Sequence, residues 1–175
     1  MKMSKRTINI CIFLAIVVAT IFVDQITKYC FEGMEKSLIG NFLWISWVDD
    51  LNSGAAFSML SDVAWAKWLF ISVGIITFLA IVYVVVFKKI SQDYLFVVAL
   101  SLVGGGVVGN VIDRIVFGAV RDFIDFRFSG FAIFNFADSF LCIGCALLVL
   151  WVIIASVRDS KKKKVALKGE AGNDN

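Results

Sequence analysis

Four long stretches of the chain are apolar and contain no charged side chain. They are residues 7–23, 68–87, 94–112 and 139–157. A helix that crosses a lipid bilayer needs about 20 apolar residues, with about 17 as the lower limit. The pattern therefore predicts four transmembrane helices, and the first can extend past Asp24 because Tyr29 and Phe31 follow within two turns.

The segments between these helices are not simple polar loops. Residues 41–48 and 120–134 are rich in aromatic and β-branched residues, which predicts short strands at the membrane–water interface. Residues 58–67 are expected to form a short helix on the membrane surface. The predicted fold is an all-α membrane bundle of four transmembrane helices, with a small extracytoplasmic β-cradle and the interfacial helix within residues 32–67. An outer connection follows at 113–138.

Basic residues are distributed unevenly between the two sides of this bundle. Eleven of the seventeen Lys and Arg residues lie at the N-terminus, between the second and third helices, or in the tail at 158–175. Because Lys and Arg are enriched in cytoplasmic segments, both termini of the membrane domain at 1–157 are expected in the cytoplasm. The run Lys161–Lys164 is interpreted as a topology signal that contacts anionic lipids, rather than a nucleic-acid site. Ten of the fourteen acidic residues lie on the other side, so acid chemistry is expected there.

Composition restricts the chemistry further. Of 175 residues, 60% are apolar and 18% are charged, against roughly 25% charged in soluble proteins, and a soluble domain this small could not bury so much apolar surface. The absence of His removes the commonest metal ligand and general base. Cys142 and Cys145 have the spacing of a redox or metal pair, but they lie in an unbroken apolar run and are interpreted as buried, small hydrophobic residues. Neither a metal nor a cofactor is expected.

Polar residues at the helix ends are the first candidates for a site. Asp24 and Lys28 are four residues apart and share a helix face, either as a simple ion pair or as a pair that positions a substrate or partner. Asn52 and Gly54 belong to a run of small residues that predicts a turn. The amide of Asn52 can also donate and accept hydrogen bonds.

The end of the third predicted helix combines close packing with polar side chains. The run Gly104–Gly109 holds four glycines, and small residues let neighbouring membrane helices approach closely. Asn110 lies on one helix face with Asp113 and Arg114, which form either a helix-end ion pair or part of a polar site. The adjacent glycines favour the polar site.

Further acids lie before and at the start of the fourth helix. Asn135 and Asp138 are placed to cap this helix, and Asp122 and Asp125 lie in the segment before it. Without His, the best catalytic arrangement is two carboxylates that share a proton, one taking a proton from water while the other donates to a carbonyl. Spacing alone leaves open which two of these acids form the pair: Asp113, Asp122, Asp125 and Asp138.

Five sequence blocks give a resemblance to a known family. They occur in this order among the predicted helices: DQITK (Asp24–Lys28), NSGAAF (Asn52–Phe57), GGVVGNVIDR (Gly105–Arg114), VRDF (Val120–Phe123) and FNFADS (Phe134–Ser139). Together they resemble the lipoprotein signal peptidases, also called signal peptidase II, over residues 8–157. One departure is Val107, where the family commonly has Ala.

The resemblance implies an aspartyl endopeptidase that removes the signal peptide from diacylglyceryl-modified prolipoproteins, cutting just before the lipidated Cys. It implies that Asp122 and Asp138 are the catalytic pair, and it demotes Asp113 and Asp125 from that role. The family uses the remaining matched positions for support or substrate contact: Asn110, Asp113 and Arg114 beside the pair, Asn52, Gly54 and Asn135 around the substrate, and Asp24 and Lys28 in a more structural role.

The implied partners are a lipidated prolipoprotein and membrane lipids, with no nucleic acid. The chain is expected to act as a monomer in the bacterial cytoplasmic membrane, with its active site near the extracytoplasmic face. A transporter that couples ions through intramembrane carboxylates is an alternative, but it needs acids near the midplane and often repeats. A non-catalytic assembly subunit is a second alternative, in which these acids are ordinary interface charges.

Overall fold

The computed structural model describes residues 4–47, 65–88, 93–128 and 130–171. Its elements follow in this order: α1 (Lys5–Cys30), β1 (Glu35–Ile39), β2 (Leu43–Ser46), α2 (Ala66–Phe87), α3 (Tyr94–Val116), β3 (Ile124–Asp125) and α4 (Phe136–Ala171). Within these residues, four helices are long and apolar enough to cross a membrane. The predicted helical membrane fold, with four apolar helices and a small sheet, is therefore confirmed.

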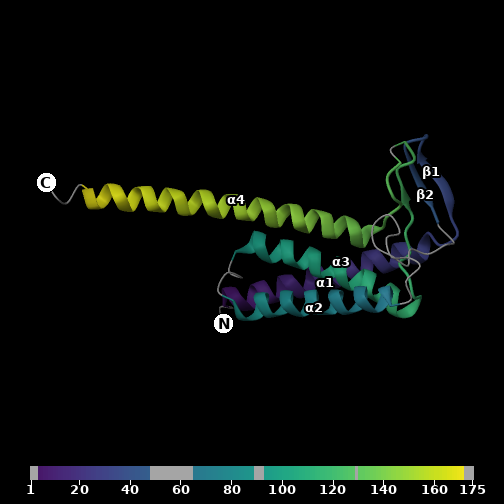
Figure 1. Ribbon diagram of the computed structural model, residues 1–175, viewed down its shortest axis with the longest axis horizontal. Helices are drawn as coiled ribbons and strands as arrows, with labels where there is room; N and C mark the ends of the chain where they lie inside the picture. The colour runs from purple at the N-terminus through teal and green to yellow at the C-terminus, as the bar shows by residue number, and fades with distance from the viewer. Residues whose placement is uncertain (1–3, 48–64, 89–92, 129, 172–175) are drawn as a thin grey trace.

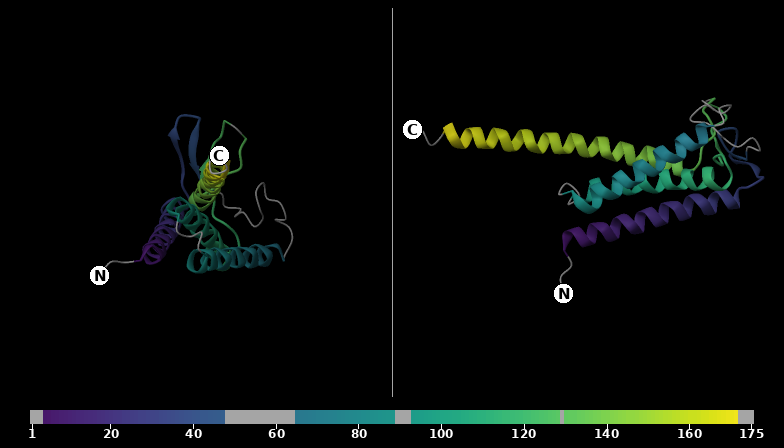
Figure 2. Two further views of the ribbon diagram at one scale, coloured as in Figure 1. Left: turned by 90° about the vertical axis from the view of Figure 1, so that its left-hand side faces the viewer. Right: turned by 60° about the horizontal axis from the view of Figure 1, so that its bottom comes forward.

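The helix α3 is the centre of the bundle, because it packs against α1, α2 and α4 (Figure 2). Successive helices run in opposite directions, so both termini lie at one end and the sheet lies at the other (Figure 1). The helix α1 extends past Asp24 to Cys30, as the apolar residues after it indicate. The helix α4 continues without a break beyond residue 157 and projects past the other helices (Figure 1).

Glycines of α3 allow its neighbours to approach at backbone distance. A Cβ atom on Gly105 would lie 2.6 Å from the Cβ atom of Thr20 in α1. A Cβ atom on Gly106 would lie 2.5 Å from the carbonyl oxygen of Ala137 in α4. Both distances are shorter than real Cβ contacts, so the interpretation of Gly104–Gly109 as a close-packing segment is confirmed.

The sheet has three antiparallel strands in the order β1-β2-β3. The strand predicted within residues 41–48 is β2. The segment 120–134 forms less strand than predicted: β3 has two residues, and an isolated bridge joins Ile124 to Phe134. The reason is that the side chain of Phe123, directly before β3, is fully buried against Phe31 and Phe136. The chain before β3 therefore packs against the ends of the helices and does not continue the strand.

Arg127 joins all three strands. Its guanidinium forms ion pairs with Glu35 of β1 at 2.6 Å and with Asp125 of β3 at 3.0 Å. It also donates to the hydroxyl of Ser46 and lies over the ring of Trp44, both in β2. The hydrogen bonds to Glu35 and Asp125 raise the pKa of Arg127 above its usual value, so this cation stays charged. Asp125 therefore belongs to the sheet.

Asn52, Gly54 and most of the interfacial helix expected at 58–67 lie outside the described residues, and the last residues of that segment form a turn and the start of α2. The expectation that Cys142 and Cys145 are buried is wrong, because both are exposed free thiols on α4. On a membrane-spanning helix the exposed face contacts lipid, which tolerates a small apolar side chain as well as a protein core does.

Candidate active site

Most of the buried polar side chains lie at the end of the bundle that carries the sheet. They come from the end of α1, the end of α3, the segment before β3 and the start of α4: Asp24, Lys28, Asn110, Asp113, Arg121, Asp122 and Asn135. Burying charged groups is unfavourable unless they are paired and hydrogen-bonded. The charged members of this cluster are therefore expected to be paired with one another.

Asp122 is held in place by the residue that follows it. The ring of Phe123 packs at 5.1 Å from the ring of Phe31 and 6.0 Å from the ring of Phe136. The backbone N–H of Phe123 donates to the carbonyl of Phe134 at 3.1 Å. Asp122 itself is only 7% exposed. The segment before β3 is thus anchored to the chain that leads into α4.

Asp138 lies in the first turn of α4, where it forms a reciprocal cap with Asn135. The side-chain oxygen of Asn135 accepts from the N–H of Asp138 at 3.0 Å, and Asp138 accepts from the N–H of Asn135 at 3.3 Å. This is the capping-box arrangement, and a carboxylate here is stabilised by the helix dipole. The predicted capping role of both residues is confirmed.

The same two residues also take part in a chain of hydrogen bonds between the acids. The amide nitrogen of Asn135 donates to Oδ1 of Asp122 at 2.7 Å and to Oδ1 of Asn110 at 3.1 Å. The amide nitrogen of Asn110 in turn donates to Oδ1 of Asp138 at 2.8 Å. Two amides therefore connect Asp122 to Asp138, and the structure brings together four of the predicted site residues.

Asp24 and Lys28 form the predicted ion pair, at 2.8 Å, but not as a pair at the membrane surface. Both side chains are fully buried and contact other helices. The ammonium of Lys28 also lies 3.1 Å from Asp113 and 3.2 Å from the side-chain oxygen of Asn110. Asp24 accepts the backbone N–H of Ala137, in the first turn of α4, at 2.9 Å. The pair thus links α1 to α3 and α4.

Gln25 and Arg121 complete this network, although sequence reasoning does not single them out. Arg121 donates to Asp113 from its backbone N–H at 3.0 Å and from its guanidinium at 2.8 Å. Gln25 donates to Asp24 and Asp113 and accepts from Arg121. The available signal is that both residues lie inside quoted blocks, each directly before or after a candidate acid.

Arg114 reaches toward α2. Its guanidinium lies 4.9 Å from the ring centre of Phe70 and donates to the backbone oxygen of Asn110 at 3.4 Å. The carboxylates of Asp138 and Asp122 lie close enough to act on its charge. Arg114 therefore supplies positive charge beside the two acids.

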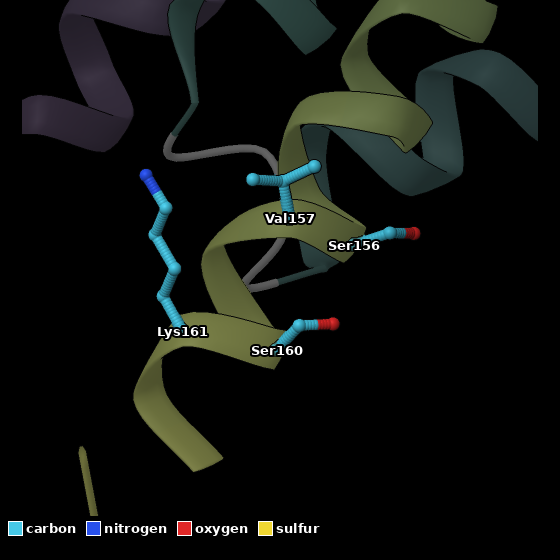
Figure 3. Close-up of a pocket in the computed structure, with 4 residues that line it drawn as sticks. All are labelled: Ser156, Val157, Ser160 and Lys161. Atoms are coloured by element: carbon cyan, nitrogen blue, oxygen red, sulfur yellow. The ribbon is translucent and has the colours of Figure 1, made fainter. Parts of the chain in front are cut away.

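A pocket of about 330 Å³ lies elsewhere, on the C-terminal half of α4 (Figure 3). Its lining residues all come from this one helix: Ser156, Val157, Ser160 and Lys161. They follow Asp138 by at least 18 residues, which is about 27 Å along a helix. This pocket is separate from the polar site.

Comparison with known proteins identifies one family. A sequence model of the family described as signal peptidase (SPase) II matches residues 16–154. A lipoprotein signal peptidase of Polynucleobacter necessarius is 33% identical over 149 residues, covering 82% of this chain and 90% of the relative. A lipoprotein signal peptidase of Ralstonia nicotianae is 39% identical over 146 residues, covering 79% and 82%.

The fold is similar to solved structures as well. A structure described as a bacterial membrane enzyme, determined at 2.3 Å resolution, superposes with a TM-score of 0.73 and 36% identity. The match covers 86% of this chain and 90% of that one. A second bacterial membrane enzyme gives a TM-score of 0.72 at 34% identity, covering 82% and 93%.

Proposed function

The chain belongs to the signal peptidase II family, whose members are membrane peptidases that remove signal peptides from prolipoproteins, and we propose that Asp122 and Asp138 perform this cleavage. The observation that carries the proposal is the pair of amides, Asn135 and Asn110, that joins the two carboxylates by hydrogen bonds. An amide between two acids orients both side chains without adding a charge. Orienting reacting groups in this way is a large part of catalysis.

The chemistry is acid–base hydrolysis of a peptide bond by two carboxylates. One, ionised, takes a proton from a water molecule, whose oxygen forms a bond to the scissile carbonyl carbon. The other, protonated, donates its proton to the carbonyl oxygen. When the tetrahedral intermediate breaks down, the C–N bond cleaves and the leaving nitrogen takes the proton from the first carboxyl group. A hydroxyl of the intermediate returns its proton to the second carboxylate, which regenerates the pair. Two neighbouring acids that share a proton can supply both functions at once.

The substrate is a prolipoprotein whose Cys carries a diacylglyceryl group, and cleavage falls just before that Cys. The site lies at one end of the bundle, and long apolar side chains are exposed along the outer faces of the helices, such as Leu14, Ile76 and Val149. A lipidated peptide can therefore approach the site while its acyl chains remain among the membrane lipids. The sheet beside the site provides a surface for the peptide.

The orientation follows from charge. Both termini lie at the end of the bundle opposite the sheet (Figure 1). Most of the basic residues belong to the terminal segments and to the segment between α2 and α3, whereas Asp122 and Asp138 lie near the sheet. The rule that cytoplasmic segments are basic places the termini in the cytoplasm and the site near the extracytoplasmic face of the bacterial inner membrane. A monomer suffices, because one chain supplies both carboxylates.

The test is a cleavage assay in detergent micelles with a lipidated prolipoprotein and its unlipidated form. We expect the wild-type protein to cleave only the lipidated form. Asp122→Asn and Asp138→Asn should each lower kcat by about 10²-fold to 10⁴-fold, the range in which general acid–base catalysis contributes. Asp125→Asn is the matched control, because Asp125 contacts Arg127 in the sheet, and it should retain activity within a few-fold of wild type.

Each other outcome has a definite meaning. If Asp122→Asn or Asp138→Asn cleaves as fast as wild type, the proposed pair is wrong. If the folded wild-type protein cleaves neither substrate, the peptidase assignment itself fails and the ion-transport alternative returns.

A further inference from the structure

Each proposed catalytic aspartate directly follows a residue whose backbone N–H is bound by a buried carboxylate. The N–H of Arg121, just before Asp122, donates to Oδ2 of Asp113 at 3.0 Å. The N–H of Ala137, just before Asp138, donates to Oδ1 of Asp24 at 2.9 Å. The two buried carboxylates therefore fix the backbone at the two points from which the catalytic side chains extend.

These buried carboxylates are in turn connected to each other. The ammonium of Lys28 contacts Asp24 at 2.8 Å and Asp113 at 3.1 Å. The amide nitrogen of Gln25 makes the same connection, with 3.0 Å to Asp24 and 3.1 Å to Asp113. Asp24, Lys28 and Asp113 are all 0% exposed. The result is a continuous buried connection from one catalytic backbone segment to the other.

Arg121 makes a bidentate contact with Asp113, at one end of this connection. Its guanidinium donates to Oδ1 of Asp113 at 2.8 Å and to Oδ2 at 3.3 Å. It also donates to the side-chain oxygen of Gln25 at 2.9 Å. A planar guanidinium in such a bidentate contact fixes direction as well as distance, which an ammonium does not.

The energetics of buried ion pairs favour a geometric role for this cluster. Removing charged groups from water is unfavourable, and well-packed apolar residues in place of a buried ion pair are often equally stable or more stable. Stability alone therefore does not account for two carboxylates and two cations buried at this end of the bundle. Their directional contacts do account for the fixed placement of the segments around Asp122 and Asp138.

We propose that Gln25 and Arg121 are positioning residues that, through Asp24 and Asp113, set the separation of the two catalytic carboxylates. This role rests on the proposed function of Asp122 and Asp138. Neither Gln25 nor Arg121 contacts the reacting atoms, and both act through the backbone N–H contacts described above.

A change in the separation of the carboxylates has a specific kinetic signature. Two interacting acids lose their protons in two steps, and a stronger interaction separates the steps more widely. Within the described part of the chain, the charged side chains around the pair are Asp24 and Lys28 from α1, Asp113 and Arg114 from α3, and Arg121. A variant that preserves all these charges but loosens the pair should therefore bring the two limbs of the bell-shaped pH–rate profile closer together.

Two charge-preserving variants test the proposal. Gln25→Met removes the amide contacts to Asp24, Asp113 and Arg121. Arg121→Lys removes the bidentate guanidinium contact with Asp113 but keeps the positive charge. We expect kcat for the lipidated substrate to fall by about tenfold to a hundredfold, because small displacements of reacting groups have effects of this size. The KM should change by less than about twofold, and the pH–rate profile should narrow.

The matched control is Thr27→Val on the same turn of α1. Among the described residues, the hydroxyl of Thr27 donates only within its helix, to the carbonyls of Val23 and Asp24, so kcat and the pH profile should match wild type. Thermal unfolding in detergent checks that the variants fold. If Arg121→Lys does not fold, Gln25→Met decides the question.

The outcomes separate this proposal from the proposed function. If wild type cleaves, and folded Gln25→Met retains the wild-type kcat and the wild-type width of the pH profile, the positioning role is overturned. If wild type does not cleave the lipidated substrate at all, the proposed function is overturned first.

Discussion

Asn135 illustrates how one residue serves both the fold and the site through different atoms. Its side-chain oxygen accepts the N–H of Asp138 and caps α4, while its side-chain nitrogen donates to Asp122 and Asn110. The oxygen and the nitrogen cannot exchange places, because a nitrogen in the oxygen's position would face another donor. The cap therefore fixes the direction of the amide, and the amide fixes the direction of Asp122.

Two substitutions at this residue separate the roles. A Ser side chain still caps a helix, whereas Ala does not, so Asn135→Ala should lower the free energy of unfolding by about 1 kcal/mol and Asn135→Ser by much less. Both lose the donor to Asp122, so both should lower kcat by about tenfold to a hundredfold, since a hydrogen bond to a charged group contributes about 1.5–3 kcal/mol. Thermal unfolding and the micelle cleavage assay measure the two effects. Wild-type kcat for Asn135→Ser would show that the amide nitrogen plays no part in catalysis.

At the level of elements, the site depends on the close contact between α3 and α4. Ala137, against which Gly106 packs, directly precedes Asp138. Gly106→Ala should therefore lower the free energy of unfolding by about 1–3 kcal/mol, the usual effect of overpacking. It should also lower kcat, because α4 must shift. Thermal unfolding and the cleavage assay check both expectations.

Gly104→Ala is the matched control on the same helix. Its added Cβ would lie 3.5 Å from the ring of Phe78, an ordinary contact distance. Since Ala is favoured over Gly within a helix by roughly 0.5–1 kcal/mol, this variant should be as stable as wild type or more stable. If Gly106→Ala behaves like Gly104→Ala, the close contact of α3 with α4 is not what positions Asp138.

The sequence predicts the helices well because a membrane span depends on a run of about 20 consecutive apolar residues, which can be recognised without knowing the rest of the fold. It predicts the sheet less well: β3 is short because the ring of Phe123 packs against Phe136 and against Phe31, which is distant in sequence. The close packing of α3 was predictable from its glycines. Val107, the departure from the family, is accommodated because it faces Gly74 of α2.

The site is predictable only in part, for a similar reason. The helix face of Asn110 and Asp113 and the caps of α4 follow from local spacing. Spacing does not select Asp122 from the other acids, because a segment without regular structure defines no face, and the family resemblance made that choice. Arg121 and Gln25 are 96 residues apart in sequence and meet in space, which no local pattern encodes.

At the scale of the whole molecule, chain direction and charge together define an orientation. Four antiparallel helices bring the two ends of the chain to one side, and the sheet and the acids to the other (Figures 1 and 2). A peptidase that acts on exported proteins needs its site on the far side of the membrane from the ribosome. The asymmetric distribution of Lys and Arg predicts that orientation.

Thiol labelling in cells tests this orientation directly. In a variant whose four native cysteines are replaced by Ala, Lys36→Cys places one thiol on exposed β1, and Lys161→Cys places one on exposed α4. A charged maleimide that does not cross the inner membrane should label Lys36→Cys in intact bacteria. It should label Lys161→Cys only after the membrane is disrupted, and Lys5→Cys at the start of α1 should behave like Lys161→Cys. The reverse pattern would place the carboxylates on the cytoplasmic side, where an exported prolipoprotein does not present its cleavage site. Labelling of both Lys36→Cys and Lys161→Cys in intact cells would contradict the odd number of spans, α2, α3 and α4, that lies between them.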